Sequence, residues 1–175
     1  MPDISTVWSN RFDQYALLIK KQFNVAVNTA QLQFFARFAT GFQAAFISLS
    51  VLINLVLARG LQSMLYNPGQ LRPELESIRL SQWQVLVLLA LLIGSFLRIE
   101  LAQDALPVVV FIFVLAGLSV FHALAHLKNL AKKWILLVYV LLVIFFPYLA
   151  AAFTLLAVVD SVANLRHRVH SKMKV

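Results

Sequence analysis

The sequence contains no cysteine and very little charge. Without cysteine there can be no disulfide, thiolate zinc site, iron–sulfur cluster or cysteine nucleophile. Charged residues make up 13% of the 175 residues, against roughly 25% in soluble domains. Hydrophobic residues make up 61%, and the mean hydropathy is +0.83. A soluble fold could not hide this much apolar surface, so the composition predicts an integral membrane protein.

Acidic residues are also scarce. The chain has 7 Asp and Glu against 15 Lys and Arg, which gives a formal net charge of +8. The basic residues adjoin apolar runs, so the expected partner is the bilayer with its anionic headgroups and not a nucleic acid. The sequence also lacks a glycine-rich phosphate loop, a nucleophile elbow and a dinucleotide fingerprint. It therefore predicts no enzyme, no catalytic residue and no cofactor.

The longest uncharged run extends from Trp134 to Val159. A run of 18 or more apolar residues is typical of a membrane span. At about 1.5 Å per residue it would form a helix of roughly 39 Å, longer than a bilayer core of roughly 30 Å. Pro147 removes a backbone donor and predicts a kink. Each half is too short to span alone, which favours one kinked span over a hairpin.

Three further spans are expected at 39–58, 83–97 and 105–127. Together with 134–159 they predict an all-α, polytopic membrane helix bundle of about four transmembrane helices, occupying residues 39–165. The polar loop 60–82 separates the first two spans. It carries a turn signal at Asn67-Pro68-Gly69 and a short helix opening near Pro73.

The flanking segments have different characters. In residues 1–38, apolar side chains recur at steps of three or four from Trp8 to Phe34, and the length of the stretch allows a break near Asn24–Asn28. This pattern predicts an N-terminal amphipathic helix, either interfacial on the headgroups or packed against protein. No secretory signal is recognisable in it, so the first span is expected to act as an uncleaved signal. Residues 166–175 form a basic C-terminal tail.

A polar stripe runs along the first expected span. Gln43, Ser50 and Asn54 fall on one face of a helix together with Ile47. In hydrocarbon, such groups turn toward other helices and form hydrogen bonds there. The stripe is therefore expected to be interhelical, and a ligand-facing role is the alternative.

A second candidate is a polar cluster of His122, His126 and Asp160. The two histidines are four residues apart and so share one helix face. A zinc site needs three or four ligands, and a metalloprotease helix would carry Glu where Ala123 stands. No metal site is predicted. Polar groups at a membrane-interface helix end are the favoured interpretation, ahead of a proton-linked role.

The distribution of basic residues indicates which side of the membrane the termini face. Four spans place both termini on one side, together with nine Lys and Arg, and leave six on the other side. The positive-inside rule then favours a multi-pass inner-membrane protein with cytoplasmic termini.

Several short motifs resemble a known family in their order and spacing. They are Leu65-Tyr66-Asn67-Pro68-Gly69, Gly117-Leu118-Ser119-Val120-Phe121-His122, Trp134 with Tyr139, Pro147, and Asp160 followed by Arg166 and Arg168. They resemble the C-terminal half of the YybS-like bacterial membrane proteins over residues 57–168. That family has no established function and is loosely grouped with substrate-capture subunits of energy-coupling-factor transporters. Its members are typically longer, and this chain departs from their pattern at Ala157, Val162 and Asn164.

The resulting expectation is a non-enzymatic module of a larger membrane assembly, acting with other membrane subunits or with a second copy. The resemblance implies a more specific function, which is small-molecule capture or transport. The alternatives are a structural or assembly protein acting through its amphipathic helix and basic tail, or a truncated remnant. A membrane enzyme that uses His122, His126 and Asp160 is the least favoured hypothesis.

Overall fold

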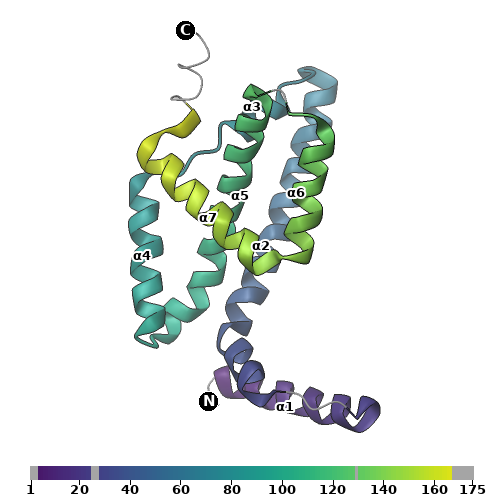
Figure 1. Ribbon diagram of the computed structural model, residues 1–175, viewed down its shortest axis with the longest axis vertical. Coiled ribbons are helices and arrows are strands. Elements are labelled where there is room, and N and C mark those ends of the chain that lie inside the picture. The colour runs from purple at the N-terminus through teal and green to yellow at the C-terminus, as the bar shows by residue number, and fades with distance from the viewer. Residues whose placement is uncertain (1–3, 25–27, 129, 167–175) are drawn as a thin grey trace. The chain divides into compact units, whose positions relative to one another are not determined.

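The computed structural model describes residues 4–24, 28–128 and 130–166, and within these ranges the chain is all-α (Figure 1). The predicted all-α membrane helix bundle is confirmed. Most of the basic tail, residues 167–175, lies outside the described residues, as do residues 1–3, 25–27 and 129. The helices are α1 (Ile4–Phe23), α2 (Thr29–Tyr66), α3 (Leu71–Glu76), α4 (Gln82–Phe96), α5 (Glu100–Leu127), α6 (Lys132–Ile144) and α7 (Phe146–Ala163).

Three of the described helices are long and apolar enough to cross a membrane. These are α2 from Ala30 onward, α5 and α7, and α4 is a shorter apolar helix of 15 residues. The expected span at 39–58 lies inside α2, which extends well beyond it at both ends. The expected span at 105–127 likewise lies inside α5, which begins at Glu100.

The start of α2 has a clear local cause. The side-chain oxygen of Asn28 accepts hydrogen bonds from the backbone N–H groups of Ala30 at 3.0 Å and Gln31 at 3.4 Å. These N–H groups have no partner inside a helix, so Asn28 acts as an N-cap. On the other side of the junction, Asn24 follows α1 with a positive φ of 51°. The 1–38 segment is therefore divided close to the expected position.

The apolar run at 134–159 is divided too. The sequence predicts one kinked helix there, whereas the structure has α6 and α7 meeting at Phe145, with φ −112° and ψ 40°. Pro147 stands in the first turn of α7. A proline is accommodated at that position because its missing N–H would have no helical partner there. Figure 1 shows the chain turning back at this break.

The chain forms two compact units. The first comprises residues 1–48 and 91–108, and the second comprises residues 49–90 and 109–175. In the first unit, the indole N–H of Trp8 donates to the hydroxyl of Thr40 at 3.1 Å and ties α1 to α2. Trp8 and Phe12 are half-buried, whereas Tyr15, Ile19 and Phe23 of the predicted apolar face are exposed.

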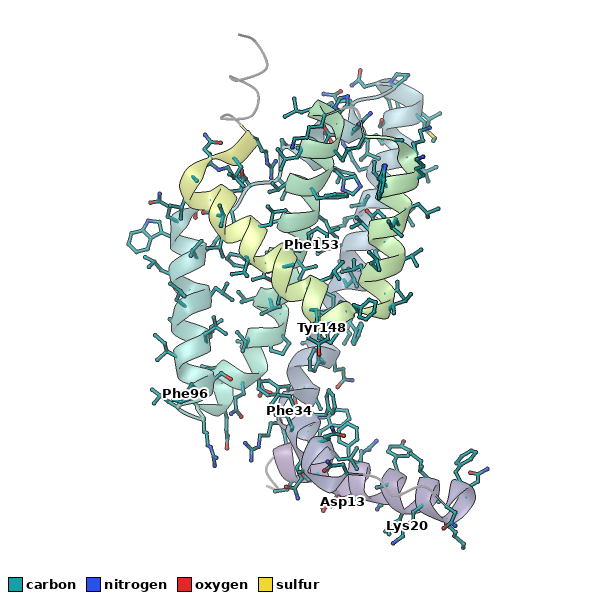
Figure 2. All side chains as sticks on the ribbon, in the orientation of Figure 1. Asp13, Lys20, Phe34, Phe96, Tyr148 and Phe153 are labelled. Carbon is teal, nitrogen blue, oxygen red and sulfur yellow. The ribbon has the colours of Figure 1, made fainter. Side chains whose placement is uncertain are left out.

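The core of the second unit lies between α5 and α7. Val114, Ala150 and Phe153 are buried there, and Phe121 meets Phe153 edge-on with 6.0 Å between ring centroids. Phe153 is labelled in Figure 2. Gly117 of α5 faces the backbone of α7 so closely that an added Cβ would lie 2.1 Å from the carbonyl oxygen of Phe153. Glycine is therefore required at this crossing.

We expect Gly117→Ala to destabilise the second unit by about 1–3 kcal/mol, the usual cost of overpacking a core. The cost arises because the obstructing atoms belong to backbone and cannot rotate away. Thermal unfolding in a mild detergent measures it. Gly60→Ala is the matched control, since its Cβ would meet only the Leu71 side chain at 3.4 Å. Equal melting temperatures for the two variants would contradict this packing.

Candidate functional site

The candidate site is a charged cluster at one end of the second unit. It joins the end of α3, the residues that follow α3, the C-terminal half of α5 and the end of α7. The charged cluster consists of Glu76, Arg79, Ser119, His126, Asp160 and Arg166. Its members come from distant parts of the sequence, so it depends on tertiary structure.

Asp160 is the buried centre of the cluster, with 1% of its surface exposed. Its Oδ2 lies 3.3 Å from Nε of Arg166, and its Oδ1 accepts the backbone N–H of Arg166 at 3.4 Å. Asn164 ends α7 in the left-handed conformation at φ 50°. That conformation reverses the chain direction at a helix end, and here it returns Arg166 toward Asp160. A buried carboxylate is tolerated only with such a partner.

Arg166 reaches past Asp160 to the segment after α3. Its guanidinium donates to the carbonyl oxygen of Glu76 and, at 2.6 Å, to that of Ile78. Burial lowers the pKa of Arg166, and the neighbouring Asp160 carboxylate acts in the opposite direction. A guanidinium remains protonated in either case.

Arg79 makes the reciprocal connection. Its Nη2 donates to the carbonyl oxygens of Asp160 at 3.3 Å and Ser161 at 3.2 Å, at the C-terminal end of α7. Carbonyls at a helix C-terminus lack helical donors and carry partial negative charge, so a cation suits them. From α5, the hydroxyl of Ser119 donates to the carbonyl oxygen of Leu75 at 2.6 Å. Three side chains therefore fix residues 75–79 against α5 and α7.

Glu76 connects the cluster to α5. One carboxylate oxygen accepts from Nε of Arg72 at 2.7 Å, and the other lies 3.4 Å from Nδ1 of His126. Nearby, Arg59 forms an ion pair with Glu74, and its hydrogen bond lowers the pKa of Glu74. Each of the three acidic residues in the second unit therefore has a basic partner.

His122, His126 and Asp160, which the sequence groups as a polar cluster, each contact different partners in the structure. Nδ1 of His122 lies 2.8 Å from the carbonyl oxygen of Leu118, and its Nε2 lies 3.3 Å from the hydroxyl of Tyr139. His126 pairs with Glu76, and Asp160 pairs with Arg166. Within the described residues, no three metal-ligating side chains of these types come together.

The predicted polar stripe lies on α2, with Gln43, Ser50 and Asn54 all exposed. The side-chain amide of Asn54 donates to the carbonyl oxygen of Ser50 at 2.9 Å, within its own helix. The structure therefore adds one intrahelical bond to the stripe.

Sequence reasoning missed Arg79, Ser119 and Arg166 as site residues. The interval from Asp160 to Arg166 across Asn164 was the available signal, because asparagine tolerates the left-handed turn that brings the two together. The backbone acceptors in residues 75–79 gave no signal, since any residue type supplies a carbonyl.

The charged cluster also bears on topology. Four single crossings would place the 60–82 loop and Arg166 on opposite sides of a bilayer. The structure bonds Arg166 to Glu76 and Ile78, and Arg79 to the end of α7. Because the chain turns back at Phe145, the start of α6 and the end of α7 lie at the same end of the second unit. The cytoplasmic location of the termini stays a prediction.

The helices and their long apolar stretches define an integral membrane helix bundle. The chain belongs to the family of predicted membrane proteins named DUF2232, whose model matches residues 14–161. The match begins in α1, so it extends well before residues 57–168, the range over which the sequence motifs resemble the YybS-like proteins. No curated protein and no solved structure matches the chain.

We expect Arg166→Gln to cost about 3 kcal/mol or more, because it leaves Asp160 buried without a cation. In the Asp160→Asn background the same change should cost clearly less, since no charge remains to be compensated. Thermal unfolding of the four proteins in detergent gives the coupling energy.

Arg72→Gln is the matched control for that cycle. Arg72 is exposed, with 60% of its side chain accessible, and Glu76 keeps His126 as a second basic neighbour, so this ion pair should contribute less than about 1 kcal/mol. Strictly additive effects of the Arg166 and Asp160 changes would show that the pair carries no stability.

Proposed function

We propose that the protein is a non-enzymatic subunit of a larger membrane assembly, and that the polar stripe of α2 is where it meets another membrane helix. The observation that carries the proposal is the exposure of Gln43, Ser50 and Asn54 on the longest apolar helix. Only 11% of the apolar window of α2 is buried within the chain. Most of this helix is therefore available to lipid or to a partner.

The side-chain amides of the stripe lie on an apolar helix and need hydrogen-bond partners there. Asn54 satisfies one N–H on its own helix, which leaves its second N–H and its oxygen to be paired. Gln43 presents a similar amide about three helical turns earlier on α2. Amides at membrane depth normally form hydrogen bonds with other helices, because lipid tails offer no partner. A second helix against this stripe would supply those partners.

The partner is a different membrane subunit or a second copy of the chain. The resemblance to YybS-like proteins supports small-molecule capture as the sharper form of the function, with the stripe facing the captured molecule. A bacterial inner membrane is the expected location.

A structural or assembly role is the second candidate, and one observation favours it. In α1, the exposed Tyr15, Ile19 and Phe23 form an apolar surface, while Trp8 holds the helix to α2. An exposed amphipathic helix anchored in this way suits the membrane interface. A truncated remnant, the third interpretation, would have neither partner nor ligand.

We expect the double variant Gln43→Leu, Asn54→Leu to lose its partner, because the amides no longer form hydrogen bonds across the interface. Native mass spectrometry of the protein extracted in mild detergent from its own membranes measures this. The wild type should carry a second polypeptide or a second copy at fixed stoichiometry, and the variant should be a lone chain.

Ser48→Leu is the control, since Ser48 is also exposed on α2 but lies about 140° around the helix from Gln43. It should retain the partner. A lone wild-type chain that carries only lipid would contradict the proposal and favour the structural role.

A further inference from the structure

We propose that the end of the second unit bearing the charged cluster faces the cytoplasmic leaflet, where Lys128, Lys132 and Lys133 bind anionic phospholipid headgroups. This inference rests on the membrane location in the proposed function and names the lipid surface that the chain recognises. It does not depend on the α2 interface, so either can fail without the other.

The basic residues of the second unit outnumber its acidic residues. Three of its arginines are paired with its three carboxylates, and Arg79 is committed to the carbonyls of α7. Lys128, Lys132 and Lys133 are exposed, and within the described ranges none of them has an ion pair. The surplus positive charge is therefore concentrated in these three lysines.

The three lysines lie at the same end of the second unit as the charged cluster. Lys128 directly follows α5, two residues after His126, and His126 contacts Glu76 of the cluster. Lys132 and Lys133 open α6. The three lysines therefore surround the connection between α5 and α6, at the end where α7 also returns.

The residues that follow the lysines in α6 indicate how deep the lysines lie in the membrane. Trp134 follows the lysines directly with 53% of its surface exposed, and Leu136, Leu137 and Val140 beyond it are exposed as well. Lysine, then tryptophan, then aliphatic side chains is the order in which a helix passes from headgroups into hydrocarbon. The positive charge therefore sits at headgroup level.

The same order favours lipid over free phosphate. A soluble phosphate needs several donors that converge in a pocket, whereas these lysines are exposed. Flexible, separated ammonium groups beside an apolar surface suit the headgroups of several anionic lipids, whose acyl chains contact that surface.

The distribution of charge in the second unit assigns the leaflet. The Lys and Arg residues in the described part of this unit all lie at the end bearing the charged cluster; they are Arg59, Arg72, Arg79, Lys128, Lys132, Lys133 and Arg166. The positive-inside rule places this side in the cytoplasm, where anionic lipids give the leaflet a negative surface potential.

The test uses Trp134 as a reporter. Trp8→Phe and Trp83→Phe remove the other two tryptophans, and the protein is placed in nanodiscs that contain brominated phosphatidylglycerol or brominated phosphatidylcholine at the same mole fraction. We expect the anionic lipid to quench Trp134 about twofold more strongly. The preference should fall at high salt, which screens exposed charges.

Substitutions identify the residues responsible. In the triple variant Lys128→Gln, Lys132→Gln, Lys133→Gln the preference should disappear, and in the corresponding Lys→Arg variant it should persist. Lys20→Gln with Lys21→Gln, on α1, is the control that should leave the preference unchanged. Equal quenching by the two lipids in the wild type would overturn the proposal, and so would a preference that survives the triple Gln substitution.

Soluble glycerol phosphate separates the two sources of the anion. If the lipid surface is recognised, millimolar glycerol phosphate should leave the preference intact at constant ionic strength. Its complete loss under those conditions would instead identify a free phosphate site and overturn the lipid assignment. If the triple Gln variant does not fold, the lipid and salt comparisons in the wild type still decide.

Discussion

The ion pair between Arg166 and the buried Asp160 is the constraint on which the arrangement of the second unit depends. A carboxylate with 1% exposure requires a cation, and Arg166 reaches it only because the chain turns at Asn164. The same guanidinium bonds to carbonyls in residues 75–79, while Arg79 bonds to the end of α7. The two arginines thus hold the segment after α3 and the end of α7 together.

The helices leave a large apolar surface uncovered. Apart from the contact of α5 with α7 around Gly117 and Phe153, much of the apolar surface of the helices is exposed, most of all on α2. In a bilayer that surface is covered by lipid tails, which leaves the few polar side chains within it as the groups that need protein partners. Membership of a family of predicted membrane proteins agrees with an apolar surface that faces lipid.

Local signals in the sequence located most of the helices. Asn67-Pro68-Gly69 marks the turn after α2, where Gly69 has φ +88°, and the apolar runs mark α2, α4 and α5. Pro147 marks a break, but the sequence could not distinguish a kink from a reversal. The structure has a reversal, and the end of α7 is held by contacts of Arg166 and Arg79 that the sequence does not signal, because they join residues about 80 to 90 positions apart through backbone carbonyls. His122 and His126 share a helix face as predicted, yet His122 contacts Tyr139 whereas His126 contacts Glu76.

The most direct test of this arrangement is the sidedness of the C-terminal end. Single cysteines at Gln70 and Ser171 can be introduced into a background that contains none, and labelled with a membrane-impermeant maleimide in oriented vesicles. Ser171 lies outside the described residues, five positions after Arg166. Because Arg166 bonds to the segment after α3, we expect Gln70→Cys and Ser171→Cys to react from the same side. Labelling of the two cysteines from opposite sides would contradict this arrangement.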